Sequence, residues 1–217
     1  MPVLGAEARL ILGLVDNGYL PRSLSKISAR FKTPYISLTL VLIFTIITLI
    51  LIPRYSSLLS IVSSAYGFTY LTIGIHYTII RKHLGTDRFK VPLGSIIAPI
   101  STILGAYIVI WSGYPSSLYG FVVMAVFLVV YLVYNSSPSR LKEDFKTGWW
   151  FIVLTALLVA ISYLGSPVFG GIGVISSSVM YVLVAAISLL FYYLGVKFSR
   201  PIESISVNAI SPESGEV

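Results

Sequence analysis

Residues 9–34 read RLILGLVDNGYLPRSLSKISARFKTP, and this stretch places turn residues and positive charge between two apolar segments. Asn17-Gly18 is typical of a turn that tolerates positive φ, and Pro21 prevents a helix from continuing through it. Thr33-Pro34 then supplies a cap and a preset φ for the next apolar segment. The stretch therefore predicts a helix, a turn, a basic amphipathic connector and a second helix.

Two loops carry a resemblance to a known family. The first is the stretch above, and the second has Arg81 at the end of an apolar segment and residues 88–92 at the start of the next. In their order and separation they resemble loops of the amino acid, polyamine and organocation permeases, over about residues 1–135. The sequence departs from the family at Asn17, which separates Asp16 from Gly18, because an Asp and a Gly are more often adjacent there in the family. The matching residues are Arg9, Asp16, Gly18, Leu20, Pro21, Thr33, Pro34, Arg81, Arg88, Phe89, Lys90, Val91 and Pro92.

The composition indicates a membrane protein. Apolar residues make up 56% of the 217 residues, charged residues 11%, and the mean hydropathy is +0.91. A soluble domain has about 25% charged residues. A lipid bilayer is therefore the expected partner, and nucleic acid is not, despite the net charge of +7. Cys is absent, which excludes disulfides, thiolate metal sites and a Cys nucleophile.

Six apolar segments contain no Asp, Glu, Lys or Arg. About 20 residues span a hydrocarbon core of about 30 Å. Four or five of the six segments therefore reach across easily, and the fifth in chain order, residues 149–164, only just. Backbone polar groups cannot stay unpaired in lipid, so each segment must be a helix. The sequence therefore predicts an all-α fold, a polytopic transmembrane helix bundle. We expect a helix end with a basic loop at 1–34, a membrane domain at 35–196 and a disordered tail at 197–217. The predicted spans are residues 35–52, 58–80, 93–111, 118–134, 149–164 and 174–196.

The positive charges predict the orientation. If all six segments cross, fourteen of the fifteen Lys and Arg residues lie on one side, and Arg54 lies on the other. The positive-inside rule then places both termini in the cytoplasm of a multi-pass cell-membrane protein. If the fifth segment did not cross, Lys197 and Arg200 would lie outside. The basic runs are interpreted as topology signals and contacts to anionic lipids.

Two predicted spans differ in what they can face. Residues 35–52 are apolar all round except for Ser and Thr hydroxyls, which can bond to their own helix, and this predicts a peripheral helix. Residues 58–80 carry small side chains at helical spacing, which let another helix come close. Tight packing alone would explain that face; in the resembling family the matching tenth helix borders the outer substrate pathway, which implies Tyr66 and Tyr70 as gate candidates. The small residues are Ser60, Ser63, Ser64, Gly67 and Gly74.

Few residues of this chain could perform chemistry. His76 lies in a predicted span, five residues before Arg81, and is interpreted as an interfacial or hydrogen-bonded His, with proton coupling as the alternative. All eight Asp and Glu residues lie outside the spans, and neither His has a carboxylate at ligand spacing. We therefore predict no metal site, no cofactor and no catalytic residue. No G-x-S-x-G motif occurs, and an enzyme is not expected.

The resemblance implies a transporter with two inverted repeats of five helices, whose substrate site lies at breaks in the first and sixth helices. This chain resembles the C-terminal portion, from about the end of the eighth helix, so the substrate-binding residues are expected in N-terminal helices that it lacks. The leading hypothesis is a truncated or split part of a secondary active transporter for amino acids or related amines. It would work by alternating access, coupled to H⁺ or Na⁺, and would not transport alone. The alternative is a non-transporting membrane scaffold or accessory subunit, and a membrane enzyme ranks third.

Overall fold

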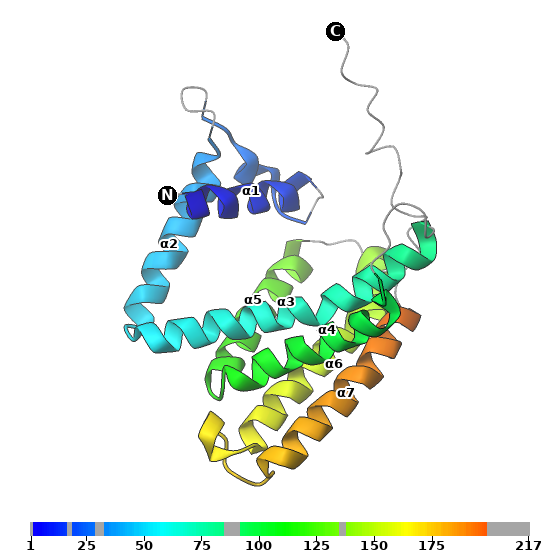
Figure 1. Cartoon of the computed structure of the whole chain (residues 1–217). Coiled ribbons are helices and arrows are strands. Elements are labelled where there is room, and N and C mark those ends of the chain that lie inside the picture. Colours follow the sequence, from blue (N-terminus) through cyan, green and yellow to red (C-terminus); the bar gives the residue numbers. More distant parts are fainter. Residues whose placement is uncertain (1, 17–18, 29–32, 85–91, 135–137, 199–217) are drawn as a thin grey trace.

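The computed structural model describes residues 2–16, 19–28, 33–84, 92–134 and 138–198. Within these residues the chain forms α-helices and two short 3-10 helices, and no strand occurs (Figure 1). This confirms the all-α polytopic bundle expected from the apolar segments. The elements are α1 (Pro2–Asp16), η1 (Arg22–Ser25), α2 (Tyr35–Leu51), α3 (Tyr55–Leu84), α4 (Gly94–Trp111), α5 (Ser116–Tyr134), α6 (Pro138–Leu164), η2 (Pro167–Phe169) and α7 (Ser177–Phe198).

Five of these helices, α3 to α7, are long and apolar enough to cross a membrane, and α2 is a shorter apolar helix of 17 residues. The fifth predicted span, 149–164, covers only the second part of α6. Helix α6 has 27 residues, and its apolar part runs from Asp144 to Leu164. The apolar run could not show this length, because the polar residues before Trp149 continue the same helix back to Pro138, a residue type favoured at the first helical position.

Two other helices begin later than their apolar runs predicted, because the backbone before them is not helical. Leu93 has a φ of 57°, in the left-handed region, so α4 begins at Gly94. Gly173 has a φ of 80°, and the Ile175 N–H donates to the Leu164 carbonyl at 2.9 Å, so α7 begins at Ser177 and not at residue 174. The predicted tail lies almost wholly outside the described residues, and Lys197 still belongs to α7.

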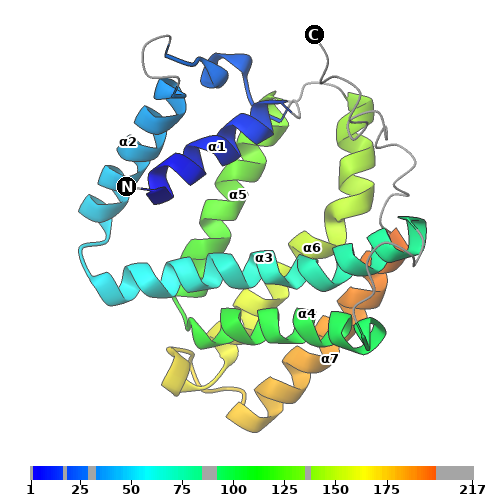
Figure 2. The ribbon, with the colours of Figure 1, turned by 45° about the horizontal axis from the view of Figure 1, so that its top comes forward.

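Helices α1 and α2, with η1 between them, form an arm that extends from one end of α3 (Figures 1 and 2). The arm packs mainly within itself, and residues 52–54 connect it to α3. Two ring contacts join it to α5. Tyr19 lies 5.9 Å from Tyr131, and Phe44 lies 6.4 Å from Phe127, measured between ring centroids.

Helix α2 is peripheral, as its composition predicted. Its threonine hydroxyls donate to their own helix, each to the carbonyl four residues earlier, at Thr39, Thr45 and Thr48. Ser37 differs, because its Oγ donates to the Leu24 carbonyl at 2.8 Å and so ties η1 to the first turn of α2. Ser37 is the buried residue of this helix.

The bundle is organised around a close approach of α3 and α4. A Cβ on Gly74 would lie 2.0 Å from the Ala98 carbonyl oxygen, and a Cβ on Gly67 would lie 2.7 Å from the Val109 side chain. From the other helix, a Cβ on Gly105 would lie 2.9 Å from the Leu71 nitrogen. The glycines that predicted close packing of residues 58–80 therefore contact α4 directly.

The core lies where α6 and α7 pack beside this pair. Leu71 and Ile75 of α3 are fully buried there, with Ile110 of α4. Helix α5 contributes less, because most of its apolar residues remain exposed, as expected for a helix that faces lipid. The α6 and α7 residues of the core are Trp150, Leu154, Leu158, Val159, Ile161, Met180, Val184, Phe191 and Tyr192.

The contact between α3 and α4 leads to a stability prediction. Gly74→Ala places a methyl group against the α4 backbone and should destabilise the bundle by about 1–3 kcal/mol, the usual range for overpacking. Gly148→Ala is the matched control, because a Cβ on this α6 residue meets nothing within 4 Å. Thermal unfolding of both variants in detergent checks this. An unfolding temperature of Gly74→Ala equal to or above that of Gly148→Ala would contradict the described packing.

Candidate functional site

A groove of about 250 Å³ opens between the beginning of α3 and the end of α4. We call it the α3–α4 groove. It lies at the end of the bundle where the α4–α5 turn meets η2, since the Tyr114 N–H donates to the Phe169 carbonyl at 2.8 Å. The lining residues are Leu59, Ser60, Ser63, Ile108, Trp111 and Ser112.

The hydroxyl groups give this groove a particular hydrogen-bonding character. Ser60 Oγ donates to the Ser56 carbonyl at 3.0 Å, and Ser112 Oγ donates to the Val109 carbonyl at 2.6 Å. Because each hydroxyl proton is used within its own helix, the oxygen lone pairs remain as acceptors. No charged residue lines the groove among the described residues. It therefore suits a small ligand that offers N–H or O–H donors.

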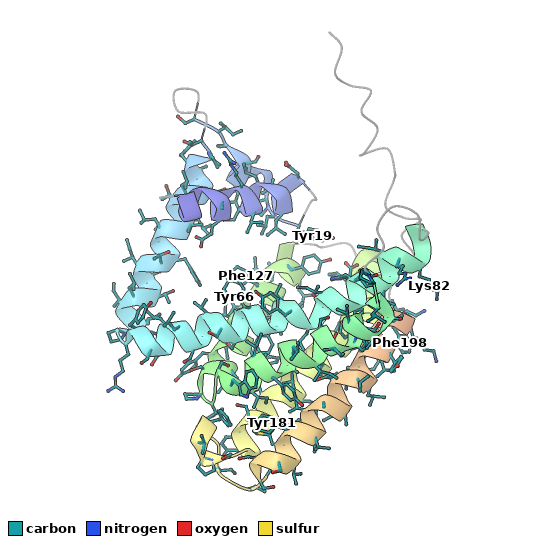
Figure 3. All side chains as sticks on the ribbon, in the orientation of Figure 1. Tyr19, Tyr66, Lys82, Phe127, Tyr181 and Phe198 are labelled. Carbon is teal, nitrogen blue, oxygen red and sulfur yellow. The ribbon has the colours of Figure 1, made fainter. Side chains whose placement is uncertain are left out.

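Trp111 is held in the wall of the groove by two tyrosines. Its Nε1–H donates to the Tyr181 hydroxyl at 3.2 Å, and its ring stacks on Tyr107 at 5.8 Å. Tyr107 in turn donates its hydroxyl to the Tyr181 carbonyl at 3.2 Å. Figure 3 shows Tyr181 on α7, so this helix supports the groove from the side of α4. The indole orientation is fixed by partners on two helices.

The gate candidates Tyr66 and Tyr70 lie side by side on an exposed face of α3. Their rings stack at 6.1 Å with an interplanar angle of 26°, and 57% and 41% of their surfaces are exposed. They follow Ser63 by three and seven residues, so all three share one face of the helix. This face continues from the groove along α3, and the role of the two tyrosines as gates stays a prediction.

The other residues singled out in the sequence lie away from the groove. His76 is exposed, about 15 Å further along α3 than Tyr66 at 1.5 Å per residue. Arg81 lies near the opposite end of α3, where its guanidinium donates to the Tyr77 hydroxyl at 3.4 Å. Arg9 and Asp16 are exposed on α1. Among the described residues no group of three or more His, Asp or Glu side chains could hold a metal ion.

The remaining loop-motif residues flank the arm or cannot be placed. Leu20 and Pro21 precede η1, Thr33 and Pro34 precede α2, and Pro92 precedes α4. Gly18, Arg88, Phe89, Lys90 and Val91 lie outside the described residues.

A comparison with models of protein families identifies the family to which the chain belongs. The amino acid permease model matches residues 1–138, well over half of the chain. The chain belongs to the amino acid permease family. The family that the two loop motifs indicated is therefore confirmed.

Two relatives of this permease chain are transporters of Bacillus subtilis (strain 168). The glutamate/serine transporter AimA is 29% identical over 88% of the chain and 36% of its own length. The aspartate-proton symporter is 31% identical over 88% of the chain and 38% of its own length. The chain thus spans little more than a third of these relatives. No solved structure matches it significantly.

The tyrosines that hold Trp111 were missed by reasoning from the sequence of this permease chain. Tyr107 and Trp111 are separated by four residues on α4, which could have suggested one face, but Tyr181 is 70 residues away. Only the packing of α7 against α4 brings it near. The available signal was Trp111 itself, an aromatic residue at the end of an apolar helix. Such a position is also typical of a residue at the membrane interface.

The α3–α4 groove leads to a prediction about water access. Because the permease chain has no Cys, a single introduced thiol can be labelled without background. Ser63→Cys should react with a water-soluble maleimide in reconstituted membranes, since reaction requires a hydrated thiolate. Val126→Cys is the control on α5, also exposed in the structure but expected to face lipid. Equal labelling of both positions would show that the groove is no wetter than the lipid-facing surface.

Proposed function

We propose that this chain is the C-terminal part of a secondary active amino acid transporter that works by alternating access. Its α3–α4 groove and the Tyr66–Tyr70 face would border the outer part of the substrate pathway. The observation that carries the proposal is the similarity to two amino acid transporters along 88% of the chain. The family match over residues 1–138 supports it.

The character of the groove supports an α-amino acid as substrate. Ser60 and Ser112 offer acceptor lone pairs, which complement the N–H donors of an ammonium group. The indole of Trp111 adds a ring beside them, and aromatic faces attract cations. We propose serine and the acidic amino acids as the first substrates to test, following the names of the two relatives. Coupling to H⁺ or Na⁺ is part of the proposal, and the relative named as a proton symporter favours H⁺.

The length of the chain supports a requirement for further helices. It spans 36% and 38% of the two relatives, and in transporters built from inverted repeats the substrate lies at broken helices from both halves. We propose that these helices belong to the same polypeptide or to a partner chain, and that they complete the main site. Uptake of an amino acid would then require both parts.

Uptake by liposomes tests the requirement. Liposomes that contain only the 217-residue chain should not accumulate radiolabelled serine, glutamate or aspartate. Liposomes that also contain the N-terminal two thirds of one relative should accumulate at least one of them under a proton gradient. The matched control is the relative's N-terminal part alone.

The outcomes separate the two hypotheses. Uptake by the chain alone would overturn the requirement for further helices. No uptake by the pair, with both parts folded and bound to each other, would favour a non-transporting scaffold or accessory subunit.

We also propose that both termini lie in the cytoplasm. The charge distribution supports this, because Arg54 alone of the fifteen Lys and Arg residues lies on the other side if all six segments cross. The hydrogen bond from the Tyr114 N–H to the Phe169 carbonyl joins the α4–α5 and α6–α7 connections, which the proposal places outside. This bond supports an outward crossing by α6. The proposed partners are the lipid bilayer and, only together with the N-terminal helices, an amino acid or amine substrate.

Labelling of intact cells checks the orientation. Arg54→Cys should react with a membrane-impermeant maleimide added outside, whereas Lys146→Cys should react only after the membrane is permeabilised. Both positions are exposed in the structure, so accessibility within the protein is matched. The reverse pattern would mean that the chain is inserted in the opposite direction.

A further inference from the structure

Helix α2 carries a groove with a volume of about 470 Å³, larger than the α3–α4 groove. We call it the α2 groove. It follows the helix from its first residue to the last turn but one, and most of its side chains are exposed. Its lining is Tyr35, Ile36, Thr39, Leu40, Ile43, Phe44 and Ile47.

The length of the α2 groove matches one leaflet of a bilayer. From Tyr35 to Ile47 the helix rises roughly 18 Å at 1.5 Å per residue. Half of the hydrocarbon core is about 15 Å. An extended acyl chain of one leaflet therefore matches the groove in length, with its headgroup at the Tyr35 end.

The chemistry of the lining favours an acyl chain over another helix. Of the small residues that let two helix backbones approach each other closely, the lining contains Thr39 but no Gly, Ala or Ser. The contact between α3 and α4 shows the contrast, because glycines at Gly67, Gly74 and Gly105 lie directly at that interface. Branched and aromatic ridges leave narrow spaces that a flexible chain can fill. The hydroxyl of Thr39 needs no hydrogen-bond acceptor within the groove, because it donates to the Tyr35 carbonyl.

Positive charge lies at the Tyr35 end of the groove. The bond from Ser37 Oγ to the Leu24 carbonyl holds η1 against the first turn of α2. Arg22 begins η1, and Lys26 directly follows it with an exposed side chain. In the sequence no acidic residue occurs between Asp16, which ends α1, and Asp87. A negatively charged headgroup is the complement.

We propose that the α2 groove, together with η1 and the Lys26 that follows it, binds an anionic phospholipid. One acyl chain lies along α2 from Tyr35 to Ile47, and the headgroup phosphate lies beside Lys26 at the end of η1. The site is independent of transport, so it stands whether or not the proposed function does. The bound lipid covers the apolar surface of α2 and neutralises η1.

Native mass spectrometry of the 217-residue chain tests the proposal. The purified chain is titrated with phosphatidylglycerol or with phosphatidylcholine of identical acyl chains, and the retained lipid is measured. We expect retention of phosphatidylglycerol in preference to phosphatidylcholine. The double variant Arg22→Gln/Lys26→Gln should reduce this retention at least about fivefold, given the usual contribution of a single cation near an anionic surface.

Two matched controls separate the site from general charge and hydrophobicity. Lys142→Gln/Lys146→Gln removes the same charge from α6 and should leave retention unchanged. Ile43→Trp fills the groove and should lower retention, whereas Val182→Trp, at an exposed position on α7, should not. Circular dichroism confirms that each variant keeps its helices.

Retention that does not distinguish the two lipids, or that falls equally in the control variants, would overturn the proposal. A diazirine amino acid in place of Ile43, photolysed in the native membrane, identifies the occupant directly. A phospholipid adduct supports the site. A protein adduct without a lipid adduct would mean that a helix of another chain or of a longer polypeptide covers this surface.

Discussion

The backbone contact between α3 and α4 is the constraint on which the rest of the bundle depends. In a membrane no hydrophobic effect drives helices together, so association relies on close packing and on hydrogen bonds between helices. Gly67, Gly74 and Gly105 permit that packing, and Thr102 adds a hydrogen bond from its Oγ1 to the Leu71 carbonyl at 3.2 Å. Because the two helices are so close, their ends form the two walls of one groove.

Hydroxyl groups then select the neighbours of this pair. Thr78 of α3 and Tyr192 of α7 are 2.7 Å apart between their oxygens, and Ser117 of α5 donates to Ser162 of α6 at 3.2 Å. An unpaired polar atom is costly in an environment that water does not enter. Such pairs therefore stabilise one arrangement of α5, α6 and α7 over others with equally apolar surfaces. The same physical reason explains why the threonines of peripheral α2 bond to their own helix.

The sequence predicted the features that depend on local chemistry. Long apolar runs identified the helices, and two charged loops identified the family. Of the small residues at helical spacing, Gly67 and Gly74 pack on α4, whereas Ser64 packs on α5. What it could not predict depends on distant contacts or on polar helix ends. The early start of α6 at Pro138 was hidden by charged residues, and the position of Tyr181 beside Trp111 required the packing of α7. The bond between Ser37 and Leu24 likewise joins two elements that only the folded arm brings together.

The separation of the arm from the bundle has an energetic consequence. If the arm swings about residues 52–54, the surface that leaves α5 is covered by lipid tails instead of water, so no hydrophobic penalty opposes the motion. The main loss is the pair of ring contacts at Tyr19 and Phe44, together about 1–3 kcal/mol at the usual strength of aromatic pairs. That is only a few times the thermal energy. Fewer contacts therefore hold the angle between arm and bundle than hold the helices within the bundle.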